Sequence, residues 1–247
     1  VVLLPLLVVV EKRFRLFRRI PRPLVDIPAL TSLLGIAWPA SVQFVLRILA
    51  MLLTHSLVAR TFTTSHDQQA TTALGVVFRL ETLALFVAMG WGSAAQTFFG
   101  QNQGAGQSKR ASASGWFAFA YDSVFMVALI WAFRVYGGDV VRFFDSDAPV
   151  VSMSLGYLAI VAPSYFALGG GIVLGNAITA AGATKMTLLI DLCVVALVQV
   201  PLSLLAVSGA NASMPRLWWA VALTSVASAI VYVAVYRRGR FLKRPAL

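Results

Sequence analysis

Charged side chains inside apolar stretches are the residues of this chain that could do chemistry. The long hydrophobic runs contain two arginines and three acids, namely Arg47, Arg79, Glu81, Asp122 and Asp191. A carboxylate in such surroundings can take up a proton or bind a cation such as sodium, and a nearby arginine favours its ionised state. Because a charge is costly there, each residue is a candidate for ion binding or for a structural ion pair.

Arg47 and Glu81 are predicted to lie at the same depth in consecutive helices. Arg47 precedes the end of its apolar stretch by about twelve residues, and Glu81 follows the start of the next stretch by about eleven. At ~1.5 Å per residue, both lie roughly 17 Å from the same end. We therefore predict an ion pair, either a fixed structural contact or a pair that opens to free Glu81 for a cation. Arg79 is a poor partner for Glu81, because helical residues two apart point in nearly opposite directions.

The other two acids also have a functional and a structural interpretation. Asp122 stands about ten residues into the third apolar segment. It either faces a central cavity as a coupling acid or bonds a hydroxyl or amide group nearby. Asp191 falls near the N-terminus of the fifth segment, where the helix dipole stabilises a carboxylate, and a structural role is expected.

The sequence has no pattern typical of hydrolytic or metal chemistry. His55 and His66 are the two histidines, and neither has metal-ligand spacing to a second histidine, a cysteine or an acid. Ser93 lacks the GxSxG pattern of a nucleophile elbow. The single cysteine, Cys193, is expected to be a small core residue. We predict no catalytic residues, no metal site and no cofactor.

The elements that must position these residues are membrane helices. The chain of 247 residues is 59% hydrophobic and 12% charged, with a mean hydropathy of +0.83, which excludes an ordinary soluble domain. A helix of about 20 apolar residues crosses the ~30 Å hydrocarbon core. The sequence therefore predicts an all-α polytopic membrane protein with six helices at about 30–59, 70–99, 112–135, 150–180, 186–207 and 217–236. Pro39, Pro163 and Pro201 are expected to perturb three of them.

The basic residues predict the orientation of these helices. The net charge is +11, but lysines and arginines cluster between apolar segments rather than along one face, which argues against nucleic acid as a partner. Segments 11–29, 100–111, 181–185 and 237–247 carry fourteen of them, and the opposite helix ends carry four. Since cytoplasmic loops are basic, those four segments, the C-terminus included, are predicted to be cytoplasmic.

Composition divides the chain into four parts. Residues 1–10 are apolar but too short to span a bilayer, and we interpret them as the end of a preceding membrane helix. Residues 11–29 are a basic linker, residues 30–236 a six-helix membrane lobe, and residues 237–247 a basic tail.

A run of glycines and carboxamides follows the second helix. It consists of Gly100, Gln101, Asn102, Gln103, Gly104, Ala105 and Gly106. Glycine permits positive φ, and the amide side chains can bond carbonyls freed at a helix end, so the run predicts a tight turn between helices. Its spacing fits neither common phosphate-binding loop.

This loop resembles the GQNxGAG-like motif of the multidrug and toxic compound extrusion (MATE) family. Three further segments are similar to that family: GIAWPA at 35–40, FRLE at 78–81 and NAITAAGATK at 176–185. The resemblance runs from about residue 30 to 240 and implies one lobe, the C-terminal one, of a twelve-helix transporter. It also implies export of drugs or organic cations in exchange for protons or sodium, by alternating access. The sodium-binding acids of one family branch are missing here, since Arg47 stands near the position of one and residues 150–180 contain no acid.

The resemblance also directs attention to residues that could contact a solute. Glu81, Arg47 and Asp122 become candidates for cation coupling. Uncharged polar and aromatic side chains that suit an organic cation through cation–π attraction are Gln43, Phe44, Phe78, Gln96, Tyr165 and Asn176. The expected partners are membrane lipid, a small organic cation, and a missing N-terminal lobe or second six-helix chain, in a cell inner membrane. A flippase for lipid-linked sugars and a non-transporting fragment stay open as alternatives.

Overall fold

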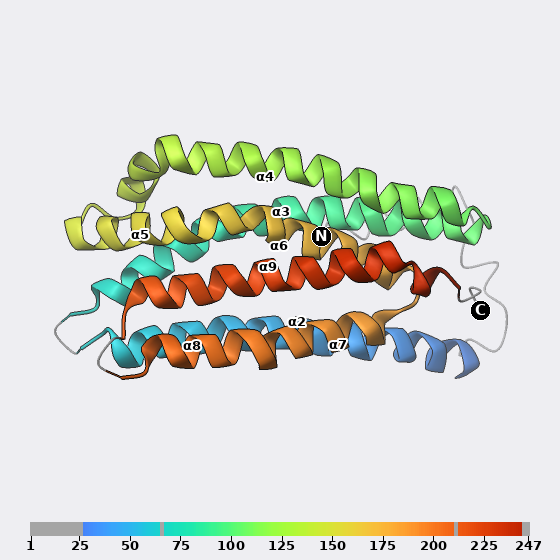
Figure 1. Ribbon diagram of the computed structural model, residues 1–247, viewed down its shortest axis with the longest axis horizontal. Helices are drawn as coiled ribbons and strands as arrows, with labels where there is room; N and C mark the ends of the chain where they lie inside the picture. Colours follow the sequence, from blue (N-terminus) through green and yellow to red (C-terminus); the bar gives the residue numbers. More distant parts are fainter. Residues whose placement is uncertain (1–26, 65–66, 210–211, 244–247) are drawn as a thin grey trace, which may run out of the picture. The chain divides into compact units, whose positions relative to one another are not determined.

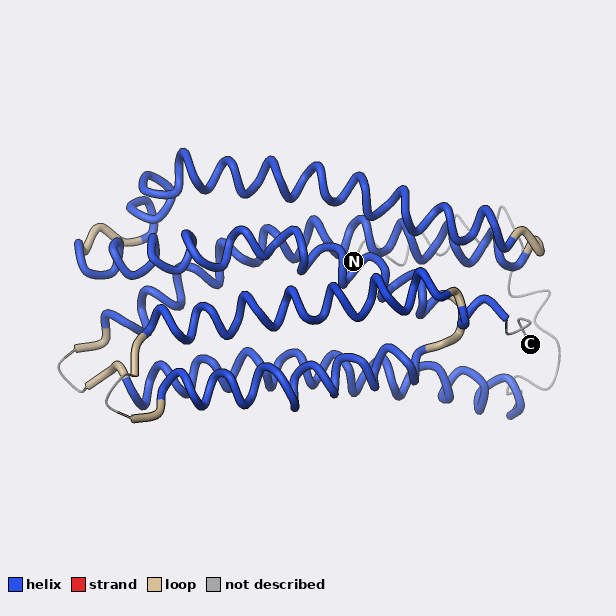
Figure 2. The backbone as a smooth tube through the Cα atoms, viewed as in Figure 1, coloured by secondary structure: helices blue, strands red, loops and turns tan. Residues whose placement is uncertain are grey.

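The computed structural model describes residues 27–64, 67–209 and 212–243, and nearly all of these are helical. Figures 1 and 2 show long helices joined by short loops. Within these described residues, six segments are long and apolar enough to cross a membrane. The elements are α2 (Ile27–Thr61), α3 (Gln69–Gly104), α4 (Ser108–Phe144), α5 (Ala148–Val161), η2 (Ala162–Ser164), α6 (Tyr165–Ala180), α7 (Thr184–Val194), η3 (Val195–Gln199), α8 (Val200–Val207), α9 (Met214–Arg238) and η4 (Arg240–Lys243). The prediction of an all-α polytopic membrane protein is confirmed.

Two of the six spans change their backbone hydrogen bonding beside a proline. Pro163 lies in the 3₁₀ turn η2 between α5 and α6, and Pro201 follows the π-helical turn η3 between α7 and α8. Proline has no N–H to donate, and its ring crowds the carbonyl four residues earlier, so the helix adjusts locally. By contrast, α2 continues through Pro39. The expected perturbation is thus confirmed at two of the three prolines.

The helices are longer than hydropathy predicted, and the loop at 100–111 is the clearest case. Residues 100–104 complete α3 instead of forming a turn, and Ala105 to Gln107 alone separate α3 from α4. Asn102 Nδ2 donates to the carbonyl of Phe98 at 2.7 Å, as expected for an amide at a helix end. Gly106 takes a positive φ of 73°. The predicted start of the turn was wrong because polarity marks the membrane boundary rather than the end of the helix.

The chain separates into two compact units at Pro39. Within the described part of the first unit, residues 27–38 form the N-terminal turns of α2, so the helix begins inside the predicted linker 11–29. The proposed helix remnant 1–10 and most of that linker lie outside the described residues. In the second unit, the predicted tail at 237–247 begins as the last turn of α9, which ends at Arg238 and is capped by Gly239 with a φ of 59°.

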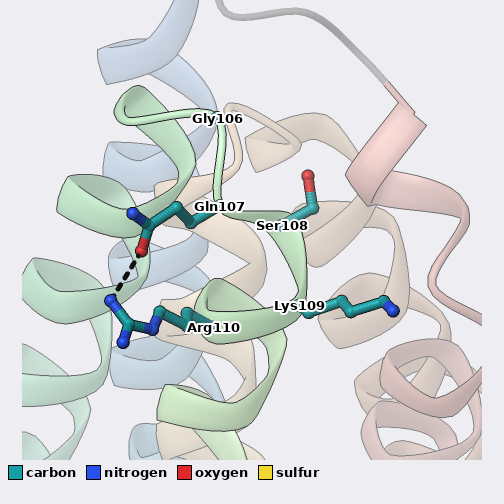
Figure 3. Close-up of a pocket in the computed structure, with 5 residues that line it drawn as sticks. All are labelled: Gly106, Gln107, Ser108, Lys109 and Arg110. Carbon is teal, nitrogen blue, oxygen red and sulfur yellow. Dashed lines mark hydrogen bonds between the residues drawn. The ribbon is translucent and has the colours of Figure 1, made fainter.

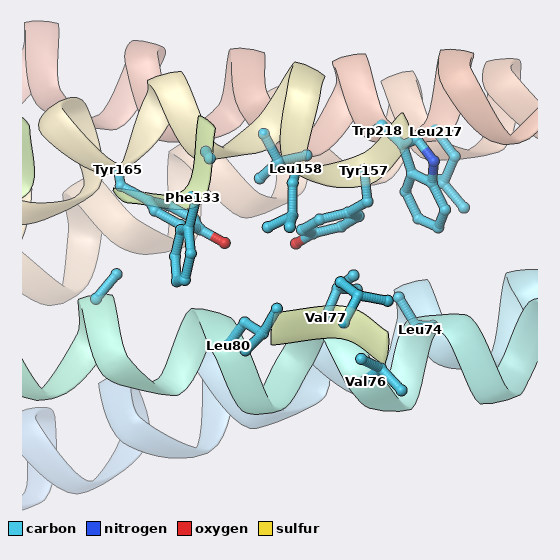
Figure 4. Close-up of a cluster of buried hydrophobic side chains, with 14 of the residues drawn as sticks. Leu74, Val76, Val77, Leu80, Phe133, Tyr157, Leu158, Tyr165, Leu217 and Trp218 are labelled. Carbon is cyan, nitrogen blue, oxygen red and sulfur yellow. The ribbon is translucent and has the colours of Figure 1, made fainter. Parts of the chain in front are cut away.

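A core in the second unit joins α3, α4, α5, α6 and α9. Figure 4 shows part of it, with Tyr157, Leu158 and Tyr165 above the α3 side chains Leu74, Val77 and Leu80. The Tyr157 ring meets Trp218 of α9 edge to face, with ring centroids 4.9 Å apart. In lipid, such helices gain little from excluding water, so close packing and hydrogen bonds hold them together.

Other large apolar side chains are exposed on the helices. On the part of α2 in the second unit, Phe44 is 64% exposed and Leu49 56% exposed. The same holds for Phe117 and Val124 on α4. Exposed apolar surface of this extent on spans of membrane length is suited to lipid or to other membrane helices. Cys193 is also exposed, which corrects its expected place in the core.

Candidate functional site

The densest polar cluster among the described residues surrounds the carboxylate of Asp191 on α7. Gln43 Nε2 donates to its Oδ2 at 2.7 Å, and the Arg47 guanidinium donates to the same oxygen at 3.2 and 3.3 Å. The Tyr232 hydroxyl donates to Oδ1 at 2.6 Å. Asp191 is therefore saturated by three donors from two other helices. The predicted structural role of Asp191 fits this geometry, although none of these partners was foreseen.

Arg47 does not pair with Glu81, and this predicted ion pair was wrong. Its guanidinium forms an ion pair with Asp191 at 3.2 Å. Equal depth along two helices says nothing about how each is rotated about its axis. Helical side chains also incline toward the helix N-terminus, so the long arginine reaches back to the level of Gln43, where Asp191 lies. The Arg47 side chain is 45% exposed and that of Asp191 only 8%.

Helical spacing accounts for the α2 half of this cluster. Gln43 and Arg47 are four residues apart and so lie on one face of α2. A second contact follows further along the helix, where Gln199 Nε2, from the π-helical turn, donates to the Ala50 carbonyl at 3.3 Å. A π-helical turn shifts the register of the following residues, and such turns are common at functional sites. The second-unit part of α2 is thus held to α7, η3 and α9 by polar contacts.

Glu81 has a different environment, in the core between α3 and α5. Its Oε2 accepts a hydrogen bond from the Tyr157 hydroxyl at 2.5 Å. In Figure 4 the hydroxyls of Tyr157 and Tyr165 point toward one another above α3. The Tyr165 hydroxyl is buried and has no hydrogen-bond partner among the described residues. Arg79 points elsewhere, with its guanidinium over the Phe144 ring at 5.8 Å, so it finds another helix as expected.

Asp122 is sealed between α4 and α6. It is fully buried, and neither carboxylate oxygen has a hydrogen-bond partner among the described residues. A Cβ placed on Gly169 would collide with this carboxylate, so the glycine provides the space that Asp122 occupies. The expected bond to a hydroxyl or amide is not found among the described residues, and the carboxylate is buried rather than exposed to a cavity, so its coupling role stays a prediction. A buried carboxylate without a partner requires an explanation.

The predicted solute-contacting residues do not form one site in this lobe. Phe44 and Gln96 are exposed, and Gln43 belongs to the Asp191 cluster. Phe78 packs against the core near His55, and Tyr165 is buried in that core. The remaining candidate, Asn176, lies against Gly92 at the contact of α6 with α3.

The family-like loop borders a shallow pocket at the turn between α3 and α4. Its volume is about 610 Å³, and it is lined by Gly106, Gln107, Ser108, Lys109 and Arg110. Figure 3 shows that Arg110 donates to Gln107 while Lys109 extends in the other direction. The length of that hydrogen bond is 3.0 Å. Arg110 is therefore hydrogen-bonded to the loop, whereas Lys109 extends away from it.

Sequence reasoning missed the two tyrosines that complete these clusters. Tyr232 and Tyr157 each donate a hydroxyl hydrogen to an acid that is distant in sequence. Both are fully buried, and a buried tyrosine hydroxyl needs a polar partner. That rule indicates that a tyrosine within an apolar span has a partner, but it does not say which acid is the partner.

Comparison with known proteins places the chain in a family. The MatE family profile matches residues 39–205, which is more than half of the chain. This chain belongs to the MatE family. A curated relative from Shewanella oneidensis, named "FAD transporter", is 28% identical over 175 residues. That match covers 71% of this chain and 38% of the relative.

Solved structures of MATE and MOP superfamily transporters share this fold. A MATE structure in the straight conformation superposes with a TM-score of 0.82 at 14% identity, over 96% of this chain and 53% of that one. A MATE transporter of Vibrio cholerae gives a TM-score of 0.76 at 18% identity, over 89% of this chain and 50% of that one. A MOP superfamily transporter from Pyrococcus furiosus superposes with a TM-score of 0.79 at 15% identity, over 89% of this chain and 49% of that one. The chain thus spans about half the length of these proteins and has the fold of one six-helix lobe.

Proposed function

We propose that this chain is one lobe of a secondary transporter that moves an organic solute across a cell inner membrane by alternating access. Membership of the MatE family and the six-helix lobe support this proposal. Alternating access requires two lobes, so the second is supplied by another part of the same polypeptide or by another six-helix chain. The excess of basic residues at one set of helix ends supports a cytoplasmic C-terminus.

We further propose that the solute is anionic, and the exposure of the charged residues carries this proposal. Within the apolar stretches, the described spans expose Arg47 and Arg79. The acids there are buried or hydrogen-bonded. Asp122 is fully buried, Asp191 is held by three donor side chains, and the half-buried Glu81 accepts from Tyr157. Exposed guanidinium groups suit carboxylate or phosphate and repel a cation. A flavin dinucleotide has this chemistry, in line with the relative named for FAD transport.

Export of drugs or organic cations is the second candidate. Tyr121 and Phe125 are exposed near the middle of α4, and the half-buried Trp91 of α3 stacks on Tyr121 with centroids 5.2 Å apart and lies beside Phe125. Aromatic faces attract cations, and they stack equally well on a planar ring such as a flavin. The aromatic cluster therefore serves both candidates, whereas the exposed arginines favour the first.

Coupling to an inward proton or sodium flux completes the proposed mechanism. Asp191 is held by Gln43 and Arg47 from α2 and by Tyr232 from α9. A movement of α2 that withdraws Arg47 would leave Asp191 free to take up the coupling cation. Glu81 stays a second candidate acid, but its change of state would involve Tyr157 rather than Arg47. Asp122 is the third and requires α4 and α6 to separate before an ion reaches it.

The test is solute uptake into inside-out vesicles that contain the complete transporter with both lobes. We expect uptake of FAD driven by a cation gradient and little uptake of ethidium, an organic cation. Collapsing the proton gradient and the sodium gradient in separate experiments identifies the coupling ion. Uptake of ethidium without uptake of FAD would favour the second candidate, and no gradient dependence for either solute would refute cation coupling.

A further inference from the structure

A groove lies between α4 and α9 close to the end of α9 at Arg238. Its volume is about 500 Å³, and it is lined by Trp116, Phe119, Val233 and Arg237. Three of these side chains are apolar or aromatic, and the fourth is a cation at the last turn of the helix. The groove therefore combines a charged mouth with an apolar wall.

A fixed contact between the two helices forms this wall. The Tyr236 hydroxyl donates to the Ser112 carbonyl at 3.0 Å, which ties the end of α9 to the first turns of α4. Trp116 packs perpendicular to the Tyr236 ring with centroids 5.2 Å apart, and Phe119 lies edge to face against Trp116 at 6.0 Å. The aromatic lining is thus ordered by protein contacts before any ligand arrives.

The cation at the mouth is available for an anion. Arg237 is exposed, and it forms no ion pair within the described segments. Lys109 stands one turn before Ser112, so the link between Ser112 and Tyr236 brings Lys109 and Arg237 to the same end of the helix pair. A ligand entering here meets positive charge first and apolar side chains next.

We propose that this groove binds an anionic phospholipid of the adjoining leaflet, with the headgroup phosphate at Arg237 and an acyl chain along Trp116, Phe119 and Val233. Arginine binds phosphate through paired N–H donors, and basic pockets between membrane helices are known to hold anionic headgroups. Tryptophan prefers the boundary between headgroups and hydrocarbon, where one end of its ring is wet and the other is apolar. A free phosphate would use the cation and leave the aromatic wall unoccupied. The site is independent of the transported solute.

The experiment measures tryptophan quenching by brominated lipids. The complete transporter is placed in phosphatidylcholine nanodiscs. One sample contains a small fraction of brominated phosphatidylglycerol, and the other contains the same fraction of brominated phosphatidylcholine. The contribution of Trp116 is the difference between the wild type and Trp116→Phe. We expect the anionic lipid to quench Trp116 at a mole fraction about fivefold lower than phosphatidylcholine requires. A preference of about this size is what one basic residue near the membrane surface provides. Arg237→Gln should abolish the preference.

Arg238→Gln is the matched control, because it removes the same charge from the neighbouring residue, which does not line the groove. It should keep most of the preference. Equal loss in both variants would mean diffuse attraction to a basic surface and would overturn the site. Equal quenching of the wild type by the two lipids, or quenching that does not involve Trp116, would overturn it as well. Displacement of the anionic lipid by excess inorganic phosphate would show a phosphate site instead of a lipid site.

Discussion

Replacing Asp191 by asparagine should destabilise the lobe more than any other single loss of charge in its membrane spans. The carboxylate accepts from Gln43 at 2.7 Å, from Arg47 at 3.2 Å and from Tyr232 at 2.6 Å. Asparagine keeps one acceptor oxygen but turns an NH₂ group toward one set of donors. Hydrogen bonds to a charged group contribute roughly 1.5–3 kcal/mol each. Since Arg47 is 45% exposed, we expect a loss of about 2–4 kcal/mol in the free energy of unfolding.

A double-mutant cycle isolates the ion pair from the other two contacts. Arg47→Gln, Asp191→Asn and the combined variant are unfolded by SDS titration in mixed micelles, followed by tryptophan fluorescence. The coupling energy between the two sites should be about 1–2 kcal/mol. The control is the cycle of Arg142→Gln with Asp139→Asn, a pair 3.8 Å apart whose side chains are 63% and 81% exposed. Such surface pairs contribute roughly 0–1 kcal/mol, so the coupling energy between Arg142 and Asp139 should be close to zero.

Two results would contradict a stabilising role for the ion pair between Arg47 and Asp191. If the coupling between positions 47 and 191 were no larger than in the control, the ion pair would not hold α2. If Asp191→Asn cost less than about 1 kcal/mol, the hydrogen bonds to its carboxylate would be weaker than buried geometry requires.

Three further predictions concern the other acids and their neighbours. Gly169→Ala should destabilise the lobe by about 1–3 kcal/mol, because its Cβ would collide with Asp122, whereas Gly90→Ala meets open space and should have little effect in the same SDS titration. Tyr157→Phe should cost about 1–3 kcal/mol by leaving Glu81 without its hydroxyl donor, and the same variant combined with Glu81→Gln should recover part of that loss. Glu81→Gln should reduce gradient-driven solute uptake in vesicles if Glu81 is a coupling acid, and unchanged uptake would make the pair with Tyr157 structural.

The arrangement of spans could be predicted because it depends on local composition. A stretch of about 20 apolar residues must cross the bilayer as a helix, since no other backbone satisfies its hydrogen bonds there. The interruptions at Pro163 and Pro201 follow from the missing N–H in the same way. The true helix ends extend past the apolar stretches. The run at 100–106 contains three glycines, and the sequence does not say which of them ends the helix; in the structure Gly106 takes the positive φ.

The partners of the acids could not be predicted, because they depend on how helices rotate and which ones touch. Equal depth suggested Glu81 as the partner of Arg47, but the rotation of α2 and α7 brings Arg47 to Asp191. The space around Asp122 depends on the position of Gly169 across a helix contact, which no spacing within one helix reveals. The resemblance in the loop at 100–106 correctly indicated the family, and it says nothing about these contacts.

An anionic solute at Arg47 is tested by the ratio of FAD uptake to ethidium uptake, measured for the complete transporter as wild type, Arg47→Lys and Arg47→Gln. Losing one charge-assisted contact of about 1.5–3 kcal/mol should raise the FAD concentration for half-maximal uptake at least about tenfold in Arg47→Gln. Arg47→Lys should keep most FAD transport, because the positive charge stays. A ratio that is the same in all three proteins would contradict an anionic solute at Arg47, and a ratio in favour of ethidium in the wild type would establish an organic cation as the solute.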